Sequence, residues 1–220
     1  MSESTANRRP LKTRSAAWAG ALAGRLGRAG ISPDLISFFS VVFAVLGLAL
    51  LLLAGVWSGW ARAACFLGAA VCIQLRLLAN MLDGMVAVEH GRASKAGPIW
   101  NELPDRVADG LFLVGAGYGA WTMGATAGAW LGWLAAVLAV LTAYVRELGR
   151  GLGFPADFAG PMAKPHRMFA LTLTCLAAAA EPLWNGQGQA VVVGLAIIAA
   201  GTALTVARRT RTLASRLAGE

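Results

Sequence analysis

The stretch that decides the fold reads Asn80-Met-Leu-Asp83-Gly84-Met-Val-Ala87 and continues, after Gly97, with Asn101-Glu-Leu-Pro-Asp105-Arg-Val-Ala-Asp109. It places aspartates at the ends of two segments that are otherwise apolar enough to cross a bilayer. Carboxylates in such surroundings are costly and indicate a functional site by default. The glycines and the alanine between them leave part of the wall without bulky side chains, as a closely packed ligand requires. We therefore expect a membrane-embedded metal site that handles a nucleotide diphosphate.

The composition of the whole chain is that of an integral membrane protein. Fifty-seven per cent of the 220 residues are apolar and only 14% are charged, against about a quarter charged in a soluble domain. The mean hydropathy is +0.62. The net charge of +8 could indicate nucleic-acid binding. The basic residues, however, lie in short stretches between apolar runs and at both termini, as membrane topology requires. We expect no nucleic-acid partner.

Six apolar runs follow one another, each near the ~20 residues that a helix needs to span a bilayer. We therefore expect an all-α integral membrane bundle of six transmembrane helices, occupying residues 31–208 and carrying the motif at 80–109. Residues 209–220 form a basic tail. Glycines are expected to break the fourth run. The six runs are 35–56, 62–82, 103–123, 127–146, 167–184 and 188–207.

Residues 1–30 are expected to form a polar tail followed by an interfacial amphipathic helix. A helical wheel over 14–28 separates an arc of arginines from an arc that holds Trp18 and two leucines, which favours a helix lying along the membrane. A frayed basic tail is the alternative. Ser32 is expected to cap the next helix, with Pro33 at its first position.

The distribution of charge predicts the topology. Sixteen of the 19 Lys and Arg residues fall in the N-terminal segment, two loops near 84–101 and 146–167, and the C-terminal tail. The positive-inside rule therefore places both termini in the cytoplasm and the active site at the cytoplasmic face of the inner membrane. Six tryptophans cluster at the opposite ends of the runs, as an outer aromatic belt would: Trp57, Trp60, Trp121, Trp130, Trp133 and Trp184.

The spacing of the polar residues indicates a metal site. Asn80 and Asp83 share one face of a helix, and so do Asn101, Asp105 and Asp109. An antiparallel pair of helices would bring both sets to the same depth. Converging carboxylates repel one another unless a cation holds them, and hard oxygen ligands suit Mg²⁺ or Mn²⁺. All five residues are therefore candidate metal ligands.

A structural alternative is that the aspartates form interfacial salt bridges. Their candidate partners would be Arg76, Arg92 and Arg106. A small-solute transporter is a second alternative, although its charges would be expected nearer to the middle of the membrane.

The motif resembles that of the CDP-alcohol phosphotransferase family, D-x2-D-G-x2-A-R, about eight residues, then G-x3-D-x3-D. The resemblance implies a homodimeric enzyme with a divalent-metal site that displaces CMP from a CDP-linked lipid, usually CDP-diacylglycerol, with an alcohol. Asp83 matches the motif directly, and the surface that would bind the CDP group consists of Gly84, Ala87, Ser94 and Gly97.

Three motif positions depart from the family pattern. The first aspartate is Asn80, the arginine is Val88, and the third carboxylate position is Asn101, with Asp105 as the fourth. A second register, shifted by one helical turn, uses Asp105 and Asp109 instead. We prefer it because it keeps two carboxylates, Asp105 as ligand and Asp109 as general base. The missing arginine could be replaced by Arg92 or Lys95, and the departures leave open a catalytically impaired scaffold.

A second cluster of cations follows the fourth run. Several cations around a pocket mouth suit an anionic acceptor such as a phosphorylated polyol. Glycerol 3-phosphate is the first candidate and inositol phosphate the next, whereas membrane topology and lipid-headgroup contact are the alternative explanation. The candidate acceptor-binding residues, which follow one another at both ends of a loop, are Arg146, Arg150, Lys164, His166 and Arg167.

Overall fold

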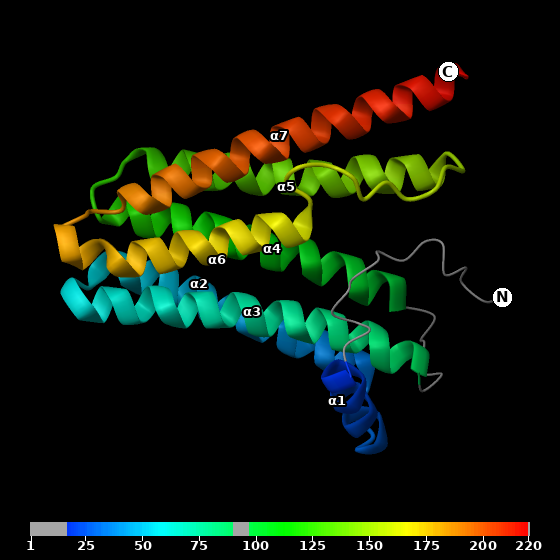
Figure 1. Cartoon of the computed structure of the whole chain (residues 1–220), viewed down its shortest axis with the longest axis horizontal. Helices are drawn as coiled ribbons and strands as arrows, with labels where there is room; N and C mark the ends of the chain where they lie inside the picture. The colour runs from blue at the N-terminus through cyan, green and yellow to red at the C-terminus, as the bar shows by residue number, and fades with distance from the viewer. Residues whose placement is uncertain (1–16, 90–96, 220) are drawn as a thin grey trace.

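The computed structural model describes residues 17–89 and 97–219, and over these residues the chain is entirely helical, without strands. Within these residues, seven α-helices and one 3-10 helix follow one another (Figure 1). Their bounds are α1 Ala17–Arg28, α2 Pro33–Val56, α3 Gly59–Glu89, α4 Gly97–Thr122, α5 Ala127–Gly151, α6 Lys164–Ala180, η3 Glu181–Trp184 and α7 Gln189–Ala218. The all-α class predicted from the sequence is therefore confirmed.

The six long helices form a closed ring. Helix α2 packs against both α3 and α4, α4 against α5, α5 against α7, α7 against α6, and α6 back against α3. Helices α3 and α4, which carry the motif, barely touch each other directly. The space between them lies inside the ring and is bridged by side chains.

Four helices are long and apolar enough to cross a membrane: α2, the part of α3 over Gly59–Ala87, α5 and α7. Helix α4 carries the charged motif in its first turns, and α6 has only 17 residues before η3 begins. The helices coincide with the six predicted runs, although α3 and α7 are longer. Helix α7 continues through the stretch that was expected as a separate basic tail.

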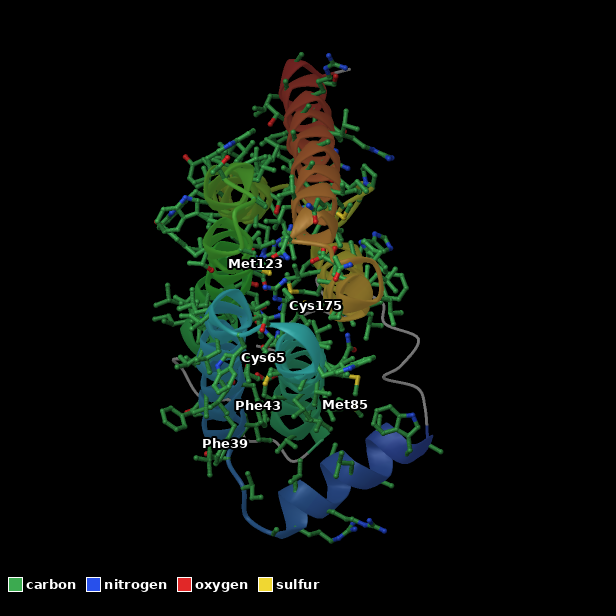
Figure 2. All side chains as sticks on the ribbon, turned by 90° about the vertical axis from the view of Figure 1, so that its left-hand side faces the viewer. Phe39, Phe43, Cys65, Met85, Met123 and Cys175 are labelled. Carbon is green, nitrogen blue, oxygen red and sulfur yellow. The ribbon has the colours of Figure 1, made fainter. Side chains whose placement is uncertain are left out.

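The beginning of α2 follows the prediction. The Leu35 amide donates a hydrogen bond of 3.2 Å to the Ser32 hydroxyl, and Pro33 is the first helical residue. Helix α1 lies across the bundle axis rather than along it, at the edge of the bundle (Figures 1 and 2). Its small residues Ala19 and Ala23 are buried in a cluster with apolar side chains of α3 such as Val86.

The expectation that glycines break the fourth run is wrong. Helix α5 is continuous, because Gly128 and Gly132 lie against Gly117 of α4 and allow the two backbones to approach closely. A β-carbon on Gly117 would lie 2.5 Å from the Gly128 carbonyl oxygen. The glycines therefore serve helix packing, as small residues do at interfaces between membrane helices.

Polar groups also close the end of the bundle opposite the motif. The fully buried Glu181 carboxylate accepts hydrogen bonds from the amides of Gly188 (2.8 Å) and Ala190 (2.7 Å) where α7 begins. Arg62 donates to the Gly186 carbonyl at 3.2 Å. Six tryptophans in α2–α5 and η3 are each at least half exposed, as an aromatic belt requires: Trp57, Trp60, Trp121, Trp130, Trp133 and Trp184.

We predict that Gly117→Ala destabilises the bundle by about 1–3 kcal/mol, because the added methyl group must displace the backbone of α5. Gly110→Ala is the matched control on the same helix, since nothing lies within 4 Å of a β-carbon there. The thermal midpoint of the detergent-solubilised protein should fall for the first variant and stay level or rise for the second. Equal midpoints would contradict the close approach of α4 and α5.

Candidate functional site

The charged residues of the motif meet inside the ring, near the end where α3 stops and α4 and α6 begin. Figure 2 looks along the bundle from the opposite end and shows how the helices surround the interior. Helices α3, α4 and α6 each contribute charged side chains.

Arg76 of α3 joins the two aspartates of α4. Its side chain is fully buried, and its Nη2 atom lies 3.0 Å from Asp105 Oδ1 and 2.9 Å from Asp109 Oδ1. The same nitrogen also donates to the Asp105 carbonyl oxygen at 3.0 Å. One guanidinium group therefore holds two carboxylates that stand one helical turn apart.

Helix α6 supplies two further cations. Lys164 at its first residue makes a short ion pair with Asp105 Oδ2, and the buried Arg167 donates a hydrogen bond of 2.7 Å to Asp109 Oδ2. Each carboxylate oxygen of Asp105 and Asp109 thus faces a cation. Since a buried charge is tolerated only when it is paired, these contacts explain how two aspartates can be accommodated inside an apolar bundle.

Asp83 has a different environment. Its Oδ2 atom accepts a hydrogen bond of 2.6 Å from the hydroxyl of Ser37 in α2, and its Oδ1 atom accepts from the Gly84 amide. Within the described residues it makes no ion pair, although the charges of Asp105 and Lys164 are near enough to act on it. Asp83 is therefore the motif carboxylate that the described chain leaves without a paired cation.

These contacts bear on the salt-bridge alternative for the aspartates. The α3 and α4 side chains do meet inside the bundle. The salt-bridge alternative holds for Asp105 and Asp109, with Arg76 as a partner but with Lys164 and Arg167 as the other two. The predicted partner Arg106 makes a longer ion pair with Asp105, at 3.8 Å, and a closer one with Glu102, at 2.8 Å.

The donor set fits one divalent cation better than two. Within the described residues, no three of the His, Cys, Asp and Glu side chains converge on one point. Mg²⁺ commonly uses one or two carboxylates and completes its shell with water and substrate phosphates. Asp83, with the half-buried Asn80 one turn earlier on α3, offers such a minimal oxygen set.

The cations proposed for the acceptor divide into three groups. Lys164 and Arg167 point into the site and pair with the aspartates, so they are less free to bind an acceptor than the sequence suggested. Arg150 and His166 are exposed. Arg146 is buried, with its Nη2 atom 2.6 Å from Glu102 and its Nε atom 2.8 Å from Glu147.

Arg146 also lines a small hollow between α5, α7 and the loop over 152–163. Arg209 and Arg216 of α7 lie in the same wall, together with Asp157. Arg209 is only 4% exposed and donates to the carbonyl oxygens of Thr142 (2.7 Å) and Ala159 (2.9 Å). Its Nη2 atom is buried without a hydrogen-bond partner in the described chain.

Sequence reasoning missed the roles of Ser37 and Arg209 and considered Arg76 only as a salt-bridge alternative. Ser37 is one polar residue in an apolar run, and Arg209 was assigned to a tail. Arg76 had a readable signal: it precedes Asn80 and Asp83 by four and seven residues, so it shares their helix face.

Some predicted residues cannot be placed. Gly84 and Ala87 are half-buried on α3, and Gly97 begins α4. Arg92, Ser94 and Lys95 lie outside the described residues. The side chains of Val88 and Asn101 also lie outside the description, although both residues belong to described helices.

Comparison with known proteins points to one group of enzymes. No protein-family model matches the chain. A phosphatidylinositol phosphate synthase of Mycolicibacterium smegmatis is 33% identical over 89 residues, which cover 40% of this chain and 36% of that protein. The synthase of Mycobacteroides abscessus is 26% identical over 191 residues, covering 86% and 80%. The chain thus spans about a third of the first relative and most of the second.

Solved structures share the fold. The Mycobacterium tuberculosis phosphatidylinositol phosphate synthase with CDP-DAG bound superposes with a TM-score of 0.75 at 20% identity, covering 90% of this chain and 94% of that one. The same enzyme in complex with manganese and citrate gives 0.70 at 19% identity, covering 89% and 88%. The helical ring is therefore the architecture of these synthases.

We predict that Arg167→Met lowers stability by about 3–5 kcal/mol, because it removes one partner of a buried ion pair and leaves Asp109 undercompensated. Arg150→Gln, which breaks only an exposed pair with Glu147, should cost about 1 kcal/mol or less. Thermal unfolding in detergent measures both. A milder effect at Arg167 than at Arg150 would contradict the buried pairing.

Proposed function

We propose that this chain, whose resemblance to the CDP-alcohol phosphotransferase family is confirmed by its relatives and its fold, transfers a phosphatidyl group from a CDP-linked lipid to an alcohol and releases CMP. CDP-diacylglycerol is the first candidate donor, since a relative of the same fold binds CDP-DAG. The observation that carries the proposal is the meeting of the α3 and α4 aspartates with the α6 cations inside that fold.

The donor enters from the side, with its acyl tails in lipid and its cytidine against the surface of Gly84, Ala87 and Gly97. Asp83, together with Asn80, would hold Mg²⁺ or Mn²⁺ at the diphosphate. When bound, the ion neutralises the diphosphate and polarises the phosphorus under attack. The manganese complex of the tuberculosis enzyme supports this choice of metal.

Proton removal from the acceptor hydroxyl is assigned to Asp105 rather than to Asp109. Asp109 is 1% exposed and both its oxygens face fully buried guanidinium groups, whereas one of the two paired oxygens of Asp105 faces a lysine that an acceptor hydroxyl can displace. Asp105 stands one turn nearer to the start of α4, and its partner Lys164 has a partly exposed side chain. We assign Asp109 a positioning role, in which it holds Arg76 and Arg167.

The acceptor is an anionic alcohol such as glycerol 3-phosphate or an inositol phosphate. Its phosphate binds in the hollow lined by Arg146, Arg209 and Arg216. The unpaired Nη2 atom of Arg209 supports this assignment, because a buried guanidinium donor needs an acceptor oxygen.

The enzyme spans the inner membrane six times, with both termini and the active site at the cytoplasmic face. Helix α6 and η3 together are long enough to cross if the site lies at the interface. Helix α1 lies along the cytoplasmic surface, which agrees with its position across the bundle axis (Figure 1). The family resemblance also implies a homodimer.

A second candidate function is that of a catalytically inactive binding protein with the same fold. Asn80 replaces a motif carboxylate, and Asp105 and Asp109 are fully engaged by cations. Such a protein would bind CDP-linked lipid without releasing CMP.

We predict that the purified protein in detergent releases CMP from CDP-diacylglycerol when Mn²⁺ and a phosphorylated alcohol are present. Asp105→Asn should lower kcat by about 10²–10⁴-fold, the usual contribution of a general base. Asp34→Asn, in the first turn of α2 and outside the ion pairs of the site, should leave kcat unchanged. Full turnover by Asp105→Asn would exclude Asp105 as the base. CDP binding without CMP release, whichever acceptor is supplied, would favour the catalytically inactive binding protein.

We predict that Arg209→Gln raises the acceptor KM at least tenfold while the donor KM changes little, because a charged hydrogen bond to phosphate is lost. Arg208→Gln, at the preceding exposed position, is the matched control and should leave both KM values unchanged. Initial rates at varied acceptor and donor concentrations separate the two constants. An unchanged acceptor KM in Arg209→Gln would show that the acceptor phosphate does not bind in this hollow.

A further inference from the structure

We infer that Arg76 is a built-in counter-ion of the site: it stands at Asp105 and Asp109 in place of a divalent ion, so that the site takes a single divalent cation, at Asp83. The inference rests on the proposed function, because it describes how that site receives metal and diphosphate. It assigns Arg76 a role that the motif does not contain.

The position of Arg76 is the first argument. Its side chain is fully buried, and one nitrogen lies within 3.0 Å of an oxygen of each α4 aspartate. A metal ion shared by Asp105 and Asp109 would have to bind these same two oxygens. Since a guanidinium group is always charged, the ion and Arg76 would repel each other at contact distance.

The balance of charge is the second argument. The three motif carboxylates Asp83, Asp105 and Asp109 stand against three cations from α3 and α6, and all three cations pair with the two α4 aspartates alone. These two aspartates therefore have no negative charge left over for a divalent ion. Asp83 has no paired cation in the described chain, so it is the carboxylate left for a metal ion.

The third argument is that the site lacks hydrogen-bond acceptors. Arg76 Nε, Arg76 Nη1 and Arg167 Nε are buried donors without a hydrogen-bond partner in the described chain. Among the described motif oxygens, Asp109 Oδ1 alone is buried without a hydrogen-bond partner, and it already lies 2.9 Å from Arg76 Nη2. The site is thus short of acceptor oxygens rather than of cations. The oxygens of a diphosphate would satisfy these donors, whereas a second metal ion would not.

It follows that the ion and the diphosphate bind together. A single carboxylate and an amide make a weak site for Mg²⁺ or Mn²⁺, and phosphate oxygens usually complete such a shell. We therefore expect tight Mn²⁺ binding only when a nucleoside diphosphate such as CDP is present.

The test counts Mn²⁺ ions bound per chain, using the electron paramagnetic resonance signal of free Mn²⁺, on detergent-purified protein with and without CDP. The expected result is one ion with CDP and none at the same Mn²⁺ concentration without it. Asp83→Asn should abolish that ion, whereas Asp34→Asn should retain it. Arg76→Met should bind a second ion, and Arg76→Lys, which keeps the charge, should still bind one.

If Arg76→Met fails to fold, Asn80→Asp provides a second test of the inference. It adds a carboxylate beside Asp83 without altering the pairs of Arg76, so it should tighten Mn²⁺ binding while the count stays at one. Two ions in the unaltered protein, no ion with CDP, or a retained ion in Asp83→Asn would each overturn the inference.

The same samples separate this inference from the proposed function. CMP release from CDP-diacylglycerol with two bound ions would leave the function standing and remove the role of Arg76. One CDP-dependent ion without CMP release would support the role of Arg76 and contradict the enzymatic function.

Discussion

The structure depends on a set of ion pairs buried inside a ring of apolar helices. Arg76, Lys164 and Arg167 hold Asp105 and Asp109 where three helices face one another. Helices α3 and α4 have little direct contact, so these side chains are what joins them across the interior. Removing one member leaves a buried charge without its partner, which costs far more than the pair itself contributes.

The same ion pairs determine what chemistry the site can perform. Carboxylates that are paired with cations are positioned for proton transfer or for orienting a substrate, but they are poor ligands for an additional metal. Asp83, bonded to Ser37 and not to a cation in the described chain, is the carboxylate to which we assign the metal ion. Two features therefore act in the same direction on the charge of the site. Asn80, in place of a motif aspartate, removes a negative charge, and Arg76 supplies a positive one.

Much of the fold could be predicted from the sequence, because helix position follows from apolar run length and from local capping. All six runs coincide with helices, and Ser32 and Pro33 begin α2 as expected. The glycines of α5 were misread, since a glycine that breaks a helix and one that packs against another helix look alike in a single sequence. Only the partner on α4, Gly117, distinguishes the two.

The site was less predictable for a related reason. The residues of the motif were found from their spacing, but their partners come from α6, almost 90 residues after Arg76, and depend on the order of helices in the ring. No local pattern indicates that α6 closes against α3. Lys164 and Arg167 were consequently assigned to an acceptor, and Arg209 to a tail, because a count of cations does not show which of them point inward.

A crystal structure with Mn²⁺ and CDP, analysed by anomalous scattering, tests the central claim most directly. The account predicts one anomalous peak per chain, beside Asp83, with Arg76 still within 3–4 Å of Asp105 and Asp109, the range of an ion pair. A peak between Asp105 and Asp109, with Arg76 turned away from them, would contradict it.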